Sequence, residues 1–297
     1  MKTIEDLIKL AKKKDKKRLV VACGDDSHVL LAVEHARKIG LIDVILVGDV
    51  KKTEAIALSN HIDLSFYKLI DEPDRMTAAL LSASLIYHKE ADILMKGFID
   101  TKLVLKAVLN KTYPLIGNKR LSHMSLIDST YYHKLFMLTD AAMNIDYSLP
   151  VKVDLINNGV EVLLKLGVFY PKVAVLAAVE KINPKMQATL DAEALVALNR
   201  GGDIKNCLVD GPFQLDNAIN EAAAVHKNIA SEVAGNADLL LLPSIEAANI
   251  FYKSLMFLSG AKSASIITGA AVPIIVTSRA DSHETKFNSI ALGVLLS

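Results

Sequence analysis

The sequence predicts an α/β protein built of two α/β/α lobes with mostly parallel sheets. Short, almost continuously apolar segments alternate with helical patterns from one end of the chain to the other. This alternation is typical of parallel strands that are covered by helices on both faces. The length of 297 residues suits two domains of ordinary size, each able to bury a core. Because such sheets bind ligands where their strands end, we expect a site in a cleft between the lobes.

The first half of the chain follows this alternation closely. Its amphipathic, lysine-rich start, residues 1–17, favours a surface helix over a signal peptide. The expected strands are 18–23, 44–48 and 91–95. The expected helices are 29–39, 51–60, 76–87 and 102–109.

The rhythm changes in the middle of the chain. After the segment 113–118, two strand candidates, 121–127 and 134–138, flank a polar turn at Asp128 and Ser129. This arrangement suggests a hairpin or a crossing between the lobes. The alternation then resumes. The expected strands are 172–179, 206–210 and 237–242, and the expected helices are 151–166, 186–198, 215–224, 226–234 and 246–258.

The last strand and helix form the most informative stretch. The apolar run 272–276 predicts a buried strand, and a polar cluster ends it. Asp281 or Ser282 can cap the following helix, with Glu284 placed after Asp281 as in a capping box. A strand end that feeds a helix N-terminus collects N–H donors, and Arg279 adds a positive charge. The pattern favours an anion site, although an ordinary junction with a surface arginine has the same local pattern.

Charge and cysteine content exclude several classes of protein. The 34 basic and 33 acidic residues give a net charge of +1. This balance argues against non-specific binding to nucleic acid or an anionic membrane, because such binding needs a concentrated positive potential. The sequence has no uninterrupted apolar stretch of about 18 residues, the length that a transmembrane helix needs. Cys23 and Cys207 lie far apart, which argues against a disulfide scaffold. We therefore expect a soluble, cytoplasmic protein without nucleic-acid or membrane partners.

The familiar cofactor and catalytic motifs are missing. No G-x-G-x-x-G fingerprint follows the first strand, and no P-loop is present, so nicotinamide and ATP chemistry lose their usual sequence support. The histidines lack metal-ligand spacing. A G-x-S-x-G elbow is absent, and both cysteines are expected to be buried and inert. Anion binding by Lys96, Lys253 and Arg279 remains, in a site where two bound substrates react with each other. No metal is expected.

Polar clusters follow the expected strands, at the edge where parallel sheets bind ligands. The clusters are 24–27, 96–101, 139–144, 210–212, 243–249 and 278–282. Each cluster alone is weak evidence for a binding site. The cluster 24–27 is also explained by a turn followed by a helix cap.

Together these blocks resemble the phosphate acetyl/butyryltransferase family over nearly the whole chain. The matching blocks, in order, are Asp210 to Asp216, Ala237 to Leu239 with Pro243, Asn249, Tyr252 with Lys253, Ser278 with Arg279, and Ser289 to Leu292. Two looser matches are Lys96 with Gly97, and Thr139 to Ala142. The segments from Pro243 to Asn249 and from Thr277 to Ser282 are most similar to the phosphate butyryltransferase branch.

The resemblance implies reversible transfer of a short-chain acyl group, butyryl or similar, between coenzyme A and inorganic phosphate. It implies two α/β/α domains, residues 1–117 with 271–297 and residues 118–270, like isocitrate and isopropylmalate dehydrogenases in outline. Coenzyme A is then a substrate and product, and no permanently bound cofactor is expected. A butyrate kinase would be a natural consumer of the acyl phosphate. The apolar excess leaves room for a homo-oligomer, a dimer or higher, along an apolar helix face of the second lobe.

By this resemblance, Ser278 and Arg279 lie at the reaction centre. The acid that is proposed as the thiol base in the acetyl branch falls near Thr285, so Glu284 or Asp281 is expected to replace it. The residues expected to bind substrates are Lys96, Gly97, Thr139, Asp140, Asp210, Gly211, Pro212, Asn249 and Lys253.

One position of the acetyl branch has no direct counterpart. In the acetyl branch an arginine is thought to hold phosphate, and the corresponding position in this sequence is at about Phe257. Lys253 or Lys262 is a candidate for that role. Three alternatives stay open: a phosphate acetyltransferase, a metal- and NAD-dependent decarboxylating dehydrogenase, and a non-catalytic protein that binds CoA or acyl phosphate. The dehydrogenase lacks its acidic metal cluster and adenine-binding segment in this sequence, and fold alone does not choose among the three.

Overall fold

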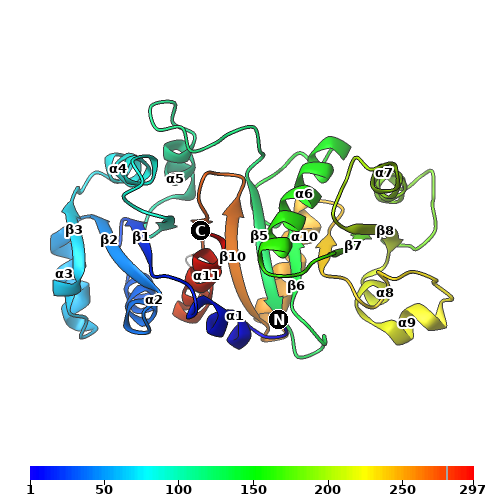
Figure 1. Ribbon diagram of the computed structural model, residues 1–297, viewed down its shortest axis with the longest axis horizontal. Coiled ribbons are helices and arrows are strands. Elements are labelled where there is room, and N and C mark those ends of the chain that lie inside the picture. The colour runs from blue at the N-terminus through cyan, green and yellow to red at the C-terminus, as the bar shows by residue number, and fades with distance from the viewer. Residues whose placement is uncertain (279) are drawn as a thin grey trace. The chain divides into compact units, whose positions relative to one another are not determined.

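The computed structural model describes residues 1–278 and 280–297 of the chain. These residues form two compact units. The terminal unit comprises residues 4–121 and 264–297, and the middle unit comprises residues 122–263 together with 1–3. Both units are built of strands that alternate with helices (Figure 1).

A mostly parallel sheet lies at the centre of the terminal unit. Its strands are β1 (Lys17–Ala22), β2 (Ile42–Gly48), β3 (Tyr67–Asp71), β4 (Ile93–Lys96), β10 (Lys262–Thr268) and β11 (Ile274–Ile275). They lie in the order β3-β2-β1-β4-β11-β10. Neighbouring strands run parallel except β10 and β11, which are antiparallel. The inner strands are almost entirely buried, as expected for apolar strands with both faces covered.

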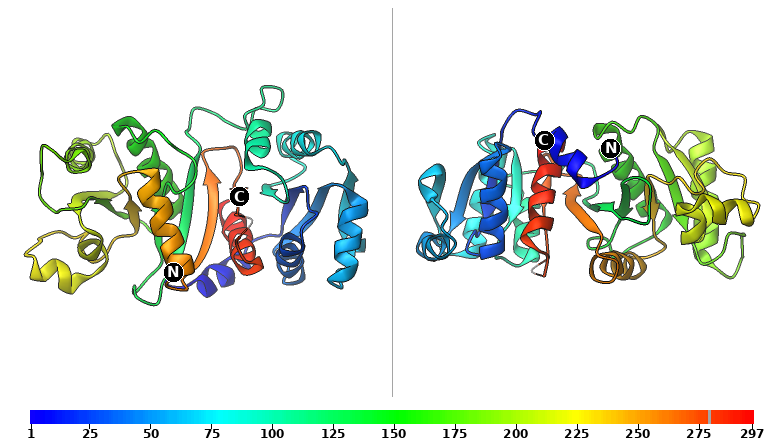
Figure 2. Two further views of the ribbon diagram at one scale, coloured as in Figure 1. Left: turned by 180° about the vertical axis from the view of Figure 1, so that it is seen from behind. Right: turned by 90° about the horizontal axis from the view of Figure 1, so that it is seen from below.

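Helices cover both faces of this sheet. They are α1 (Ile4–Ala11), α2 (Ser27–Lys38), α3 (Val50–Ser59), α4 (Arg75–Tyr87), α5 (Thr101–Val108) and α11 (His283–Leu296), with a short 3-10 helix, η1 (Leu64–Phe66). α11 packs between α2 and α1, whereas α4 packs on α5 on the opposite face (Figures 1 and 2). Four of the helices begin at an aspartate whose carboxylate accepts a backbone N–H of the first turn. These caps are Asp26, Asp49, Asp74 and Asp100.

The strands of the middle unit lie in the order β5-β6-β9-β7-β8. Its strands are β5 (Ser122–Asp128), β6 (Phe136–Thr139), β7 (Lys172–Leu176), β8 (Leu208–Phe213) and β9 (Leu239–Leu241). Its helices are α6 (Leu149–Lys165), α7 (Gln187–Gly201), α8 (Leu215–Ile219), α9 (Glu221–His226) and α10 (Ile245–Phe257). β5 and β6 are antiparallel, and the other neighbours are parallel. Buried side chains such as Phe136, Leu240 and Phe213 form the core on one side of this sheet.

The predicted class, α/β with mostly parallel sheets, is confirmed by these pairings. The hairpin predicted around Asp128 and Ser129 is also confirmed, because β5 and β6 pair there in antiparallel fashion. Among the described residues, no helix has both the length and the apolar character that a membrane span requires.

Four elements differ from the prediction. The helix predicted over 215–224 is divided at Asn220, whose backbone is extended between α8 and α9. β3 is missed because it is an edge strand with the charged residues Lys68 and Asp71. β10 is missed because it begins with a lysine and small residues. The helix predicted over 226–234 is wrong: α9 ends at His226, and Asn228 has a left-handed φ of 54°, which a right-handed helix cannot accommodate.

Candidate active site

The junction between β11 and α11 is a tight turn held by its own polar groups. The backbone N–H of Ser278 donates to the Asp281 carboxylate over 2.7 Å, and the Asp281 N–H donates to the Ser278 carbonyl over 3.2 Å. The Ser278 hydroxyl oxygen accepts the N–H of Ala280 over 3.3 Å. Ser278 is exposed. The turn therefore places a hydroxyl in contact with solvent near the N-terminal end of α11.

Ser282 caps α11, and its hydroxyl oxygen accepts the N–H of Thr285 over 3.1 Å. The predicted capping box that starts at Asp281 is wrong, because that carboxylate turns back to the N–H of Ser278 instead. Glu284 lies exposed in the first turn of α11. Arg279, the other residue predicted for the reaction centre, lies outside the described residues.

A buried lysine that sequence reasoning missed packs against this turn. The Nζ atom of Lys286 donates to the carbonyl oxygens of Ser278, over 3.1 Å, and Asp281, over 2.7 Å. Burial lowers the pKa of Lys286, and the nearby carboxylates of Asp281 and Asp26 act in the opposite direction. The sequence signal for this residue is its place at the start of the apolar face of α11, directly before Phe287.

Lys96 lies at the same edge of the terminal sheet as the Ser278 turn. β4 and β11 are parallel neighbours, with Met95 paired in register with Ile275, so both strands end at this edge. Lys96 is 6% exposed, and its Nζ lies 3.5 Å from the carbonyl oxygen of Gly97. The structure therefore brings two of the predicted groups, Lys96 and Ser278, to the carboxyl ends of adjacent strands.

Gly97 fixes the end of β4 against the end of β1. A Cβ atom at Gly97 would lie 1.9 Å from the carbonyl oxygen of Cys23, so a side chain has no room there. The next residue, Phe98, donates its N–H to the same carbonyl over 2.6 Å. This close approach accounts for the glycine as a structural requirement of the strand ends.

Arg75 adds a positive charge to this part of the terminal unit. Its guanidinium lies 3.3 Å from the Asp25 carboxylate and 5.1 Å from the centroid of the Phe98 ring. Cys23 lies nearby at the end of β1, and burial raises the pKa of its thiol to about 11. Both cysteines are buried and free. The thiol of Cys23 therefore stays protonated at neutral pH, as expected for an inert cysteine.

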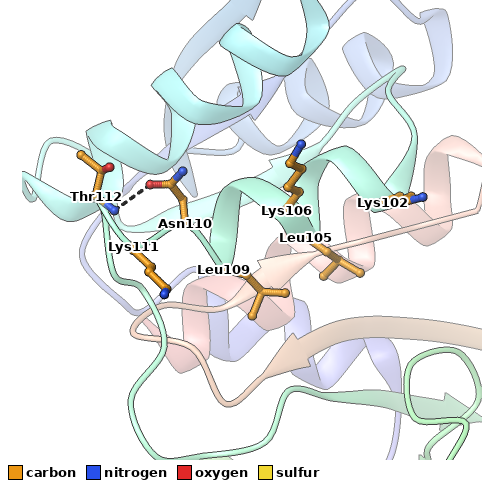
Figure 3. Close-up of a pocket in the computed structure, with 7 residues that line it drawn as sticks. All are labelled: Lys102, Leu105, Lys106, Leu109, Asn110, Lys111 and Thr112. Atoms are coloured by element: carbon orange, nitrogen blue, oxygen red, sulfur yellow. Dashed lines mark hydrogen bonds between the residues drawn. The ribbon is translucent and has the colours of Figure 1, made fainter.

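A groove along α5, which sequence reasoning also missed, is lined by lysines and leucines (Figure 3). Its volume is about 720 Å³. The lining residues are Lys102, Leu105, Lys106, Leu109, Asn110, Lys111 and Thr112. The side chains of Leu105 and Leu109 point to the same side of the helix, and Leu109 is 60% exposed. No carboxylate of the described residues lines the groove. Leucines and lysines that repeat every four residues are the sequence signal for such a face.

In the middle unit, Asp140 organises the loop after β6. Its fully buried carboxylate accepts the N–H groups of Ala142 and Met143, each over 2.9 Å. It also accepts the N–H of His123 over 3.1 Å and the side-chain amide of Asn144 over 2.6 Å. Four donors thus satisfy the hydrogen-bonding capacity of this buried side chain. These contacts give Asp140 the role of shaping the loop.

Thr139 and Asn249 belong to the same part of the middle unit. The side-chain amide of Asn249, on α10, donates to the carbonyl of Ala141 over 2.9 Å. Thr139 is fully buried, and its hydroxyl has no hydrogen-bond partner within the described part of the chain. The structure thus brings together three of the predicted binding residues, Thr139, Asp140 and Asn249.

The remaining predicted residues of the middle unit belong to β8 and α10. Asp210, Gly211 and Pro212 belong to β8, which the strands β9 and β7 separate from β6. A Cβ atom at Gly211 would lie 2.7 Å from the carbonyl oxygen of Val175, so this glycine allows β8 to approach β7. Lys253 is exposed on α10, with its Nζ 6.0 Å from the centroid of the Phe257 ring.

Comparison with known proteins identifies the family. A sequence profile described as "Phosphate acetyl/butaryl transferase" matches residues 2–78 and 74–294. The chain belongs to the phosphate acetyl/butyryl transferase family. The resemblance seen in the sequence is therefore confirmed.

Relatives of both branches of the family match the whole chain. A phosphate butyryltransferase of Clostridium acetobutylicum is 43% identical over 296 residues, which cover 100% of this chain and 98% of that protein. A phosphate acetyltransferase of Thermotoga maritima is 42% identical over 292 residues, covering 98% and 99%. The crystal structure of a branched-chain phosphotransacylase from Enterococcus faecalis V583 matches with a TM-score of 0.84 and 32% identity, covering 94% of this chain and 98% of that chain.

Proposed function

We propose that this protein transfers a short acyl group, butyryl or a close relative, reversibly between coenzyme A and inorganic phosphate. The observation that carries the proposal is the 43% identity over the whole chain to a phosphate butyryltransferase. The exposed Ser278 turn near the N-terminal end of α11 supports it, because N–H groups and the helix dipole favour an anion at such a position. Coenzyme A acts as a substrate, and the proposal includes no resident cofactor.

The reaction needs charge stabilisation more than a covalent intermediate. A phosphate oxygen attacks the thioester carbonyl, a carbon–oxygen bond forms, and the carbon–sulfur bond then breaks. The thiolate takes up a proton and leaves as free coenzyme A. We assign the Ser278 hydroxyl to the oxyanion and Arg279 to the charge of phosphate or thiolate. We assign the thiol proton to Glu284, which is exposed in the first turn of α11. The Asp281 carboxylate accepts the Ser278 N–H and holds the turn.

The groove along α5 is a suitable place for the nucleotide end of coenzyme A. That end carries a diphosphate, a 3′-phosphate and the flat apolar face of adenine. The groove offers three lysines beside Leu105 and Leu109, and its volume of about 720 Å³ is in the usual range for small-molecule sites. We therefore assign the coenzyme A phosphates to Lys102, Lys106 and Lys111.

The test is the release of coenzyme A, followed with a thiol reagent, from butyryl-CoA and from acetyl-CoA, each with and without phosphate. Phosphate-dependent release that is faster with butyryl-CoA is the expected result. Faster release from acetyl-CoA would favour the second candidate function, that of a phosphate acetyltransferase. The 42% identity to the Thermotoga maritima phosphate acetyltransferase supports this candidate. Binding of acyl-CoA without any release would leave a non-catalytic binding protein.

The proposal extends to the enzyme that uses the product, to the location of the protein and to its assembly. The acyl phosphate product is a substrate for a kinase that transfers its phosphate to a nucleotide, such as a butyrate kinase. We also propose a cytoplasmic location, since both cysteines are free thiols, as is usual in a reducing compartment. A homo-oligomer is part of the proposal because α10 leaves large apolar side chains exposed.

A further inference from the structure

Lys286 is a charged residue at a position where charge is costly. The residue is 4% exposed, and a buried ammonium group is unfavourable unless its N–H groups are bonded. Its Nζ donates to two backbone carbonyl oxygens, those of Ser278 and Asp281. The turn before α11 therefore supplies much of the polar environment that keeps this lysine inside the protein.

The same two hydrogen bonds have a consequence for the turn. The bonds between Ser278 and Asp281, in both directions, close the turn on itself. They do not fix it relative to α11. The two bonds from Lys286 join both ends of the turn to a side chain of that helix. Since Ser278 is exposed, packing of its own side chain contributes little to holding it in place.

We propose that Lys286 is a positioning residue that holds the Ser278 hydroxyl in its working place by tying the turn to α11. The proposal rests on the proposed function, which gives Ser278 its part in the reaction. Lys286 acts through the two carbonyl groups and does not touch the substrates. Misplacement of a reacting group by about 1 Å can lower a rate about 10²-fold, so this role predicts a large effect on turnover.

Three variants distinguish an effect on the position of the turn from an effect on the stability of the whole protein. Lys286→Met removes both hydrogen bonds while keeping an unbranched side chain of similar length. Lys286→Arg keeps a positive donor in a different shape. The control is Ser289→Ala on the same helix, where the buried hydroxyl accepts the Ser265 N–H over 2.9 Å and donates to the Thr285 carbonyl over 2.8 Å. It removes α11 contacts without touching the turn.

Two measurements are made on each variant: amide hydrogen exchange of the peptide that covers 276–286, and the kcat and KM of thiol release from butyryl-CoA. For Lys286→Met we expect faster exchange in the turn and a kcat about 10²-fold lower, with little change in the KM for butyryl-CoA. Lys286→Arg should show exchange and a kcat that lie between those of Lys286→Met and the wild type. Ser289→Ala should lower the Tm without either effect.

The proposal is overturned if Lys286→Met exchanges like the wild type, or if its loss of kcat is no larger than that of Ser289→Ala. If Lys286→Met does not fold, Lys286→Arg carries the test, because unchanged exchange together with unchanged kcat then contradicts the proposal. If the wild type releases no thiol from either acyl-CoA, the proposed function fails, while the exchange of the turn still decides whether Lys286 holds it.

Discussion

Arg279 is the side chain on which the proposed reaction depends most. Its guanidinium stays charged and offers a planar set of donors that matches phosphate. We expect Arg279→Ala to lower kcat by about 10²–10³, the usual loss when one well-placed donor is removed. The protein should keep its Tm and circular dichroism. Arg200→Ala, at an exposed position on α7, is the matched control, and near-normal turnover of Arg279→Ala would contradict the assignment.

Glu34, inside the terminal unit, contributes a pH-dependent part of the stability. It accepts hydrogen bonds from Arg37 over 2.7 and 2.9 Å and from the Tyr67 hydroxyl over 2.5 Å. Burial alone would raise the pKa of Glu34, but the bonds from Arg37 and Tyr67 hold it at about 2. In an unfolded chain the pKa of a glutamate is about 4.3. The folded pKa is the lower one, so this contribution is present above about pH 4.3 and is lost as the pH falls toward 2.

We therefore expect Glu34→Gln to lower the free energy of unfolding at pH 7, and to lower it less as the pH falls from about 4.3 toward 2. Urea unfolding at a series of pH values measures the loss of unfolding free energy at pH 7 and its decrease at lower pH. The control is Glu54→Gln, at an exposed position on α3, which should follow the wild type. An equal loss of stability at pH 7 and at pH 3 would show that the charge of Glu34 is not the cause.

At the scale of single elements, the sequence predicted what depends on local pattern. Buried apolar runs predicted β1, β2 and β4, and an aspartate after a strand starts four of the helices. Elements whose pattern is set by their neighbours were missed: β3 lies at a sheet edge, and β10 is rich in small residues. The roles of Lys286 and Asp140 depend on which backbone groups the fold brings to them. Spacing along the chain carries no such information.

The lysines of α5 give a prediction that belongs to one element. Lys102 and Lys106 line the groove on the same helix as the apolar pair Leu105 and Leu109. If the groove holds the phosphates of coenzyme A, Lys102→Gln combined with Lys106→Gln should raise the KM for butyryl-CoA and leave the KM for phosphate nearly unchanged. The effect should shrink at high salt, because surface charges are screened within about 8 Å at physiological ionic strength.

The matched control for these lysines is Lys12→Gln combined with Lys16→Gln. Both residues are exposed near α1, with the same spacing of four, and lie outside the groove. Equal KM values for butyryl-CoA in the two double variants would rule out the groove as the coenzyme A site.

At the scale of the whole molecule, α10 is the element that points to assembly with a second copy of the chain. Of its 13 residues, Ala248 is the buried one, while Ile250 is 66% and Phe257 64% exposed. Glu246 and Lys253 are both exposed and lie seven residues, about two turns, apart. In an antiparallel pair of α10 helices centred near Ile250, each glutamate would face the partner's lysine. Such self-complementarity is what a two-fold symmetric interface requires.

A charge placed at the centre of this face should therefore separate the copies. We expect the wild type to show a molar mass in light scattering that is a multiple of the 32.2 kDa chain, and Ile250→Glu to shift it toward one chain. The cause is that burying an unpaired carboxylate in an apolar interface is strongly unfavourable. Phe169→Glu is the control, since Phe169 is 91% exposed in the loop between α6 and β7 of the same unit. A wild-type mass of one chain, or an equal shift for both variants, would exclude α10 as the interface.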